Sequence, residues 1–355
     1  MKVKKLKLKV KIILFILLIF LISSLSLCIY IKSCFNPVDK NSTKEIEFTV
    51  NQGDAGITIL NNLKDKDLIK SPLVGKIYLR SHKFDPKIGT YKLKKSQSFK
   101  DILKILEKGK PNVWLTIVEG KRVTFIAEEI SKKFDYTSEE VLNVMDDKEY
   151  VKTLIEKYSF LTEDILKEGI YHPLEGYLFP ETYSFKADES IQSIIETMLD
   201  TTKDKISKLD FSKSNYSVHQ IYTLASIIEL EGSAASDRNG IAGVFYNRLN
   251  KNISLGSDVT TYYGAKKDFS SDLTVSELNT CNPYNTRGNC NPGLPIGPID
   301  SPSIKSIEAA LNPTPSDYLF FVADKDGKTY FSKTNAEHEQ IVNKLKAEGL
   351  WYNYN

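Results

Sequence analysis

The N-terminal segment is the feature that most constrains what this chain can fold into. Six lysines fall within the first eleven residues, and residues 12–31 then run without a charge. In a helix about twenty residues reach roughly 30 Å, the thickness of the hydrocarbon core of a bilayer. Because the lysines precede the apolar run, the positive-inside rule keeps the N-terminus in the cytoplasm and places the remainder outside. We therefore predict a basic cytoplasmic tail (1–11), a single transmembrane helix (12–34) and a polar linker (35–44).

A cleaved signal peptide is the alternative interpretation of the same segment. The apolar run is longer than the usual signal core of about 7–15 residues, and no site of small residues follows it. A lipoprotein site at Cys28 is disfavoured because bulky Leu27 precedes the cysteine. The retained anchor is therefore the favoured prediction, with the rest of a single-pass protein on the outer side of a cytoplasmic membrane.

Composition and charge exclude some classes of partner. The 48 Lys and Arg nearly balance the 45 Asp and Glu, which argues against a nucleic-acid partner. The four histidines are scattered and no cysteine pair has zinc-site spacing, so neither a metal nor a cofactor is predicted. Outside the cytoplasm Cys281 and Cys290 can form a disulfide, with two free thiols as the alternative.

Two α+β regions follow the linker. In residues 45–110, "EIEFTV" alternates as a strand does, "AGITILNNLKDKDLI" has helical spacing and "GTYKL" is typical of a short strand. Ser98 and Asp101 have the spacing of a capping box, and Gly109 ends the helix that they begin. We predict a small α+β module here.

The larger α+β region, residues 111–355, carries further helix signals. "RVTFIAEEISKKF" is helical, and Thr137 with Glu140 forms a capping box before "EEVLNVM". Ser301 is expected to cap a helix that stops at Asn312 and Pro313. "DYLFFVAD" and "TYFSK" flank "KDG" and predict a hairpin.

One apolar helix ends in two acids. In "SVHQIYTLASIIELEG", Ser217 and Gln220 form a capping box and Gly232 suits a left-handed position after the last turn, so the helix should run from Val218 to Glu231. Glu231 borders the apolar face, whereas Glu229 lies roughly 110° from the centre of that face. A partly buried carboxyl at the negative end of a helix holds its proton longer, as a general acid must. The alternative is a solvated pair of acids on a fraying turn.

Motifs that follow this helix complete a family pattern. "VEG", "EGYLFPETY", "ASIIELE", "VFYNRL", "YNT", "GLPIGPI" and "FVAD" occur in this order over two hundred residues. The chain resembles the endolytic lytic transglycosylases of bacterial cell walls, the MltG or YceG-like family. This resemblance implies that residues 45–110 are a LysM-like subdomain and that residues 111–355 are the catalytic domain.

The resemblance also implies roles for individual residues. The second acid of the family's E-x-E motif falls on Glu231, which becomes the expected catalytic residue. Two departures, Val259 and Ile296, replace prolines of the family pattern and affect the shape of the groove rather than Glu231. The substrate-binding residues that the resemblance implies are Glu229, Arg248, Asp258, Thr260, Tyr284 and Asn285.

The implied activity is cleavage of the β-1,4 bond between N-acetylmuramic acid and N-acetylglucosamine without water, which leaves 1,6-anhydro ends and terminates strand elongation. The implied partners are peptidoglycan glycan strands, the membrane, and penicillin-binding proteins with the wall-elongation machinery. Two other classes stay open at this point: a hydrolase of the same polymer with Asp258 or Glu229 as base, and a non-enzymatic wall-binding scaffold.

Overall fold

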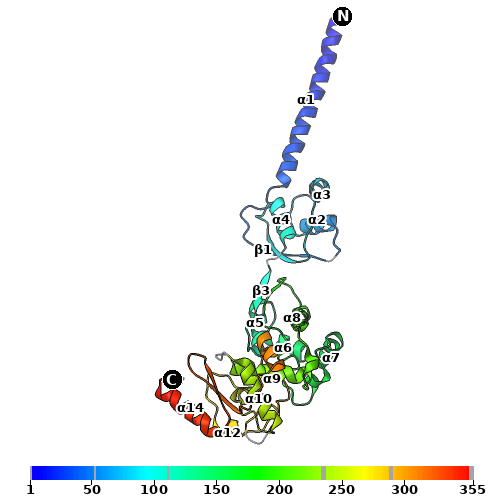
Figure 1. Ribbon diagram of the computed structural model, residues 1–355. Helices are drawn as coiled ribbons and strands as arrows, with labels where there is room; N and C mark the ends of the chain where they lie inside the picture. Colours follow the sequence, from blue (N-terminus) through cyan, green and yellow to red (C-terminus); the bar gives the residue numbers. More distant parts are fainter. Residues whose placement is uncertain (1, 52, 110–111, 233–236, 288–290, 352–355) are drawn as a thin grey trace. The chain divides into compact units, whose positions relative to one another are not determined.

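The chain is described here by a computed structural model that covers residues 2–51, 53–109, 112–232, 237–287 and 291–351. Backbone contacts divide it into two compact units. Unit 1 comprises Met1–Asn112 with Lys186–Asp188, and unit 2 comprises Val113–Phe185 with Glu189–Asn355. Figure 1 shows both, with the elements labelled in chain order.

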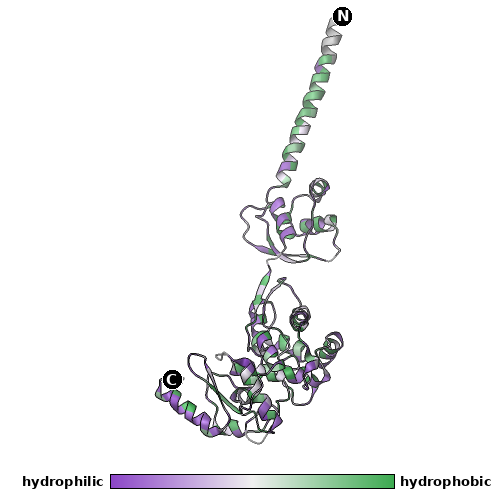
Figure 2. Cartoon of the chain, in the orientation of Figure 1, coloured by the Kyte–Doolittle hydropathy of each residue, from purple (hydrophilic) through white to green (hydrophobic). Residues whose placement is uncertain are grey.

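Unit 1 begins with the long helix α1 (Lys2–Cys34), which contains the predicted apolar segment. Residues Val10–Cys34 have a mean hydropathy of 3.1 and are coloured mostly as hydrophobic in Figure 2. Their large apolar side chains are exposed. Twenty-five residues of helix extend about 37 Å, which is enough to cross a bilayer. By length and composition the segment is therefore compatible with a single-pass anchor, and equally with a signal sequence.

The rest of unit 1 is a two-stranded antiparallel sheet covered by short helices. The predicted strands form β1 (Glu45–Val50) and β2 (Gly89–Lys94), paired from Glu45 with Lys94 to Val50 with Gly89. The capping box of Ser98 and Asp101 begins α4 as predicted, and Gly109 has the positive φ of 73° expected after its end. Helix α3 was not predicted from the sequence. The helices are α2 (Gly56–Asp65), α3 (Pro72–Ser81) and α4 (Phe99–Lys108).

Unit 2, in its described part, is mainly helical with two small two-stranded antiparallel sheets, so the chain is α+β as expected. Strand β3 (Val113–Thr116) pairs with β4 (Thr182–Phe185), and β5 (Phe320–Ala323) pairs with β6 (Thr329–Ser332) in the predicted hairpin. The helices are α5 (Val123–Lys133), α6 (Ser138–Asp146), α7 (Lys148–Lys157), α8 (Ile191–Ile206), α9 (Val218–Glu231), α10 (Arg238–Asn250), α11 (Asp258–Gly264), α12 (Val275–Asn279), α13 (Ile304–Leu311) and α14 (Asn335–Ala347), with 3₁₀ turns at Glu163–Leu166 and Phe211–Lys213.

Helix α9 runs through the core of unit 2. Its bounds and its capping box of Ser217 and Gln220 are as predicted, and every residue from Ile221 to Glu229 is buried. Helices α10, α11 and α13 pack against it. Because α9 is buried on all sides, its C-terminal turn has a fixed position in the fold.

Two local predictions were wrong. Gly232 is not left-handed, since its φ is −90°; an added Cβ would lie 2.7 Å from the Ile228 carbonyl oxygen, so close packing is what favours glycine. Helix α13 begins two residues later than expected, with Ser303 as its N-cap, because Ser301 pairs instead with Lys121 in an isolated bridge. The predicted Cys281–Cys290 disulfide stays a prediction because Cys290 lies outside the described residues.

Candidate active site

A cleft of about 820 Å³ opens at the C-terminal end of α9. Its walls come from segments far apart in the sequence, namely the C-terminal parts of α9 and α10, the turn before α11, α11 and the loop after it, α12 and the loop after it, β5 and α14. The lining residues are Glu231, Phe245, Arg248, Leu255, Gly256, Ser257, Asp258, Val259, Tyr262, Phe269, Asp272, Leu273, Leu278, Arg287, Phe320, Phe321 and His338.

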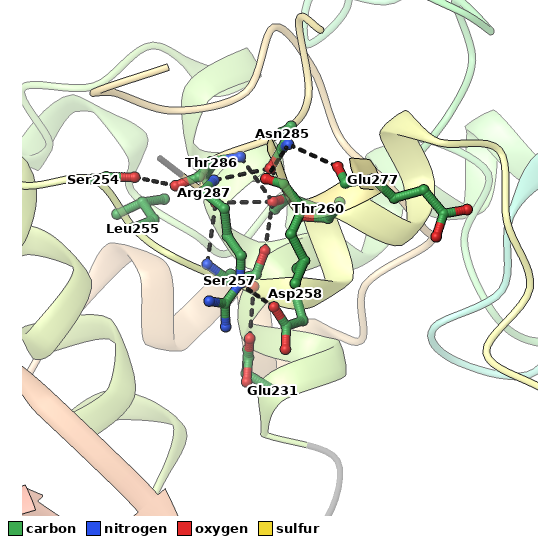
Figure 3. Close-up of polar contacts among 12 residues, drawn as sticks. Glu231, Ser254, Leu255, Ser257, Asp258, Thr260, Glu277, Asn285, Thr286 and Arg287 are labelled. Carbon is green, nitrogen blue, oxygen red and sulfur yellow. Dashed lines mark hydrogen bonds and ion pairs between the residues drawn. The ribbon is translucent and has the colours of Figure 1, made fainter. Parts of the chain in front are cut away.

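Glu231 is partly buried in the wall of this cleft. The Ser257 hydroxyl donates a hydrogen bond of 2.6 Å to its Oε1 (Figure 3). Burial raises the pKa of Glu231 and the charge of Asp258 raises it further, while the Ser257 hydrogen bond and the charges of Arg287 and Arg248 oppose the shift. The net result is a raised pKa, so Glu231 keeps its proton at a higher pH than an ordinary glutamate, as the sequence argument required.

A buried hydroxyl network holds Ser257 in place. Its backbone N–H donates to Thr286 Oγ1 at 3.2 Å, and its carbonyl accepts from Thr260 Oγ1 at 2.7 Å. The hydroxyls of Thr260 and Thr286 are 2.8 Å apart, and both side chains are fully buried (Figure 3). Thr260 therefore does not line the cleft but fixes the residue that touches Glu231.

Arg248 and Asp258, both predicted site residues, do line the cleft. Asp258 stands on the first turn of α11 and forms an ion pair with Arg287. Arg248 donates to the carbonyl oxygens of Leu319, at 2.6 Å, and Leu255, at 2.8 Å, and its guanidinium lies 4.9 Å from the Phe320 ring centroid. Arg248 thus joins two walls of the cleft while keeping its charge beside the site.

Glu229 faces away from the cleft. Its Oε1 pairs with Arg238 at 3.3 Å, and its Oε2 accepts the backbone N–H of Ser303, the N-cap of α13, at 2.9 Å. Burial raises the pKa of Glu229, but the hydrogen bonds from Ser303 and Ser306 and the charge of Arg238 outweigh burial, and the pKa is lowered. The two acids of α9 therefore differ in both position and ionisation.

Tyr284 and Asn285 lie beneath the site rather than in its wall. Tyr284 is 1% exposed, accepts the backbone N–H of Tyr171 and packs against the rings of Tyr171 and Tyr263, with centroids 4.7 Å away in each case. Asn285 accepts from Thr261 Oγ1 at 2.8 Å and from the backbone N–H of Arg287 at 2.9 Å. A substrate-binding role for Glu229, Tyr284 or Asn285 stays a prediction.

Comparison with known proteins places this geometry in a family. A model of the YceG-like family matches residues 48–344. The chain belongs to the YceG-like family. An endolytic murein transglycosylase of Bacillus subtilis (strain 168) is 35% identical over 323 residues, which are 89% of either chain. One of Streptococcus pneumoniae (strain ATCC BAA-255 / R6) is 35% identical over 337 residues, 88% of this chain and 60% of the relative.

A solved structure also resembles this YceG-like protein. The 2.6 Å crystal structure of a yceG-like protein from Listeria monocytogenes superposes with a TM-score of 0.61 at 37% sequence identity. The match covers 84% of this chain and 99% of the other.

Several cleft residues of the YceG-like protein were missed by the sequence analysis. Ser257 and Arg287 adjoin recognised motifs, and that adjacency was the available signal. His338 on α14 has a buried Nδ1 without a hydrogen-bond partner in the described part of the chain, and no local pattern marks it. The rings of Tyr262 and Phe269, with centroids 4.8 Å apart, form an apolar wall.

Among the described residues, no cluster of His, Cys, Asp or Glu side chains could hold a metal ion.

Proposed function

We propose that this YceG-like protein is an endolytic lytic transglycosylase that cuts the N-acetylmuramic acid–β-1,4–N-acetylglucosamine bond within peptidoglycan strands and leaves 1,6-anhydro ends. Its relatives are named endolytic murein transglycosylases. The observation that carries the proposal is Glu231, a partly buried carboxyl with a raised pKa in the wall of an 820 Å³ cleft.

In the proposed mechanism Glu231 acts twice. Its protonated carboxyl gives a proton to the glycosidic oxygen as the bond to the muramic acid C1 breaks. Positive charge develops on that sugar, and the sugar's own 6-hydroxyl attacks C1. The Glu231 carboxylate then takes the hydroxyl proton, which restores the acid. No water enters, so the product is an intramolecular acetal, the 1,6-anhydro ring.

The surroundings of the other acids support a single-carboxylate mechanism over hydrolysis. Ordinary glycosidases use a second carboxylate as base or nucleophile. Asp258 lines the cleft but is engaged by Arg287, and Glu229 is held by Arg238 and the start of α13 on the other side of α9. In this proposal Arg248 and Asp258 flank the glycan. The residues that line the cleft are held in place by Thr260, Tyr284, Asn285 and Glu229.

We further propose that α1 anchors the protein in the bacterial cytoplasmic membrane with unit 2 outside, and that residues 45–110 form a LysM-like subdomain. An enzyme held at the membrane meets nascent strands, so its cuts would terminate their elongation beside penicillin-binding proteins and the wall-elongation machinery. Intact-mass measurement of the purified protein checks the anchor. A mass that lacks the first thirty or so residues would show a cleaved signal peptide instead.

Mass spectrometry of digested peptidoglycan tests the activity. When purified glycan strands are incubated with the full chain, internal cuts should yield shorter strands with 1,6-anhydro-muramic ends. Glu231→Gln should form this product about 10²–10⁴-fold more slowly. Reducing ends would identify a hydrolase, and unchanged glycan with retained binding would identify a scaffold. Either result overturns the proposal.

A further inference from the structure

Helix α3 of unit 1 exposes an apolar pair. Leu73 and Ile77, one turn apart, are 67% and 57% exposed. Val74, about 100° round the helix from Leu73, is 8% exposed, and Tyr78, about 100° from Ile77, packs against Phe99 with ring centroids 5.7 Å apart. The pair therefore takes no part in the core of unit 1 and points outward.

The same helix adjoins the end of the apolar helix α1. The Phe35 ring, just past α1, lies 5.5 Å from the ring of Tyr78. Lys70, two residues before α3, donates to the Ser33 carbonyl at 3.1 Å, and Cys34 is 4% exposed. These contacts hold α3 beside the point where α1 ends (Figure 1).

The charges on the outward side of α3 suit an anionic surface. Lys76 and Arg80 are exposed, and at 100° per residue they share the outward side with Leu73 and Ile77. Neither cation forms an ion pair with an acid in the parts of the chain that the structure describes. An apolar pair flanked by cations is the pattern of a helix that lies in the headgroup region of a bilayer.

We propose that α3 docks on the outer leaflet of the membrane, with Leu73 and Ile77 at the acyl boundary and Lys76 and Arg80 on lipid phosphates. This inference rests on the proposed anchoring by α1. Helix α1 alone would leave unit 1 free to tilt and rotate, whereas a second contact through α3, which packs beside the end of α1, would fix unit 1 against the bilayer.

Ile88 provides a matched control in the same unit. It is 58% exposed, about as much as Ile77. Ile88 lies directly before β2, at the Gly89 end of that strand, whereas Lys94 is at the other end. The Asp39 N–H donates to the Lys95 carbonyl, so the linker from α1 lies at the other end of the strand. Five residues of strand separate these ends by about 17 Å. Ile88 should therefore stay in water when α3 touches lipid.

The test uses single-tryptophan variants of the full chain in nanodiscs that contain phosphatidylglycerol. In a Trp114→Phe, Trp351→Phe background, Ile77→Trp should emit at shorter wavelength than Ile88→Trp and should be quenched by lipids brominated on the acyl chain. Adding Lys76→Glu and Arg80→Glu should reduce that quenching. Phe20→Trp, within the apolar run, reports on the anchor, and matching thermal unfolding of all variants checks their fold.

The outcomes separate the inference from the anchoring on which it rests. The docking of α3 is overturned, with the anchor intact, if Phe20→Trp is quenched but Ile77→Trp is quenched no more than Ile88→Trp. Absent quenching of Phe20→Trp overturns both. Emission of Ile77→Trp at short wavelength without lipid quenching means that protein, for example a second copy of the chain, covers the face, and this also overturns lipid docking.

Discussion

At the scale of single residues, two glutamates separated by one leucine have different surroundings. Glu231 faces a cleft and accepts a hydrogen bond from one hydroxyl. Glu229 instead pairs with an arginine and accepts the N–H of Ser303, the N-cap of α13. Burial favours a raised pKa at both carboxyls. Only at Glu229 do the hydrogen bonds from Ser303 and Ser306, together with the positive charge of Arg238, outweigh burial and lower the pKa. The chemistry is therefore expected at Glu231 and a structural role at Glu229.

Glu229→Gln should lower stability far more than catalysis. The amide keeps the shape of the side chain but removes the charge that Arg238 and Ser303 share, which should cost about 1–3 kcal/mol of unfolding free energy. Denaturant unfolding and anhydro-product formation measure the two effects. Glu231→Gln is the matched comparison, with a normal melting temperature and a rate about 10²–10⁴-fold lower. An inactive Glu229→Gln beside an active Glu231→Gln would reverse the assignment.

Ser257→Ala should move the alkaline limit of activity upward. The Ser257 hydroxyl stabilises the Glu231 carboxylate, so its loss should raise further a pKa that burial already raises. Glu231 must be protonated to act as the acid, and the alkaline limb of kcat/KM against pH reports that pKa. Ser257→Thr keeps a hydroxyl and should restore the wild-type profile. An unmoved limb in Ser257→Ala would mean that Ser257 does not tune Glu231.

At the scale of elements, the end of α9 depends on a close approach. A Cβ on Gly232 would lie 2.7 Å from the Ile228 carbonyl oxygen and 3.0 Å from Cγ of Arg238, the residue that pairs with Glu229. Backbone cannot yield as a flexible side chain does, so the last turn and Arg238 must shift together. The final turn of α9 is where Glu231 stands.

Gly232→Ala should therefore cost about 1–3 kcal/mol of unfolding free energy through overpacking, and it should lower kcat as Glu231 shifts. Gly293→Ala is the control, because a Cβ there has no neighbour closer than 3.9 Å. Melting temperature and kcat of the two variants give the comparison. Equal melting temperatures would show that the turn relaxes without strain.

At the scale of the whole molecule, a buried acid ties distant segments of unit 2 together. Glu175 is 1% exposed and accepts hydrogen bonds from the Val123 N–H and the Tyr263 hydroxyl, each at 3.0 Å. Burial raises its pKa to about 7, against the opposing charge of His172 and these hydrogen bonds. Glu175 therefore titrates in the folded protein near neutral pH.

Stability should fall as pH rises from about 4.5 to about 7. In that window the unfolded chain releases the Glu175 proton while the folded chain keeps it, so unfolding becomes easier by up to about 3 kcal/mol, and no further change from this group follows above pH 7. Wild type should lose this stability between pH 5 and pH 8, whereas Glu175→Gln has no carboxyl to titrate. The variant should therefore become more stable relative to wild type as the pH rises through that range. A difference that does not change with pH would contradict the raised pKa.

Local signals in the sequence were sufficient for much of the fold. The apolar run, the capping boxes of α4, α6 and α9, and the hairpin of β5 and β6 were all predicted, because each depends on residues within a few positions of one another. The border position of Glu231 followed from helical geometry alone. Motifs in a fixed order were sufficient to indicate the family.

Tertiary structure alone decided which groups meet. Ser303 is 74 residues from Glu229, Ser257 is 26 from Glu231, and no local pattern marks either pair. The same holds for Tyr284, which packs against two other tyrosines, and for α13. The N-cap of that helix is Ser303, whose N–H donates to Glu229. Capping and periodicity are properties of neighbours along the chain, whereas burial, ion pairing and the resulting pKa values depend on residues that only the packed core brings within hydrogen-bond distance.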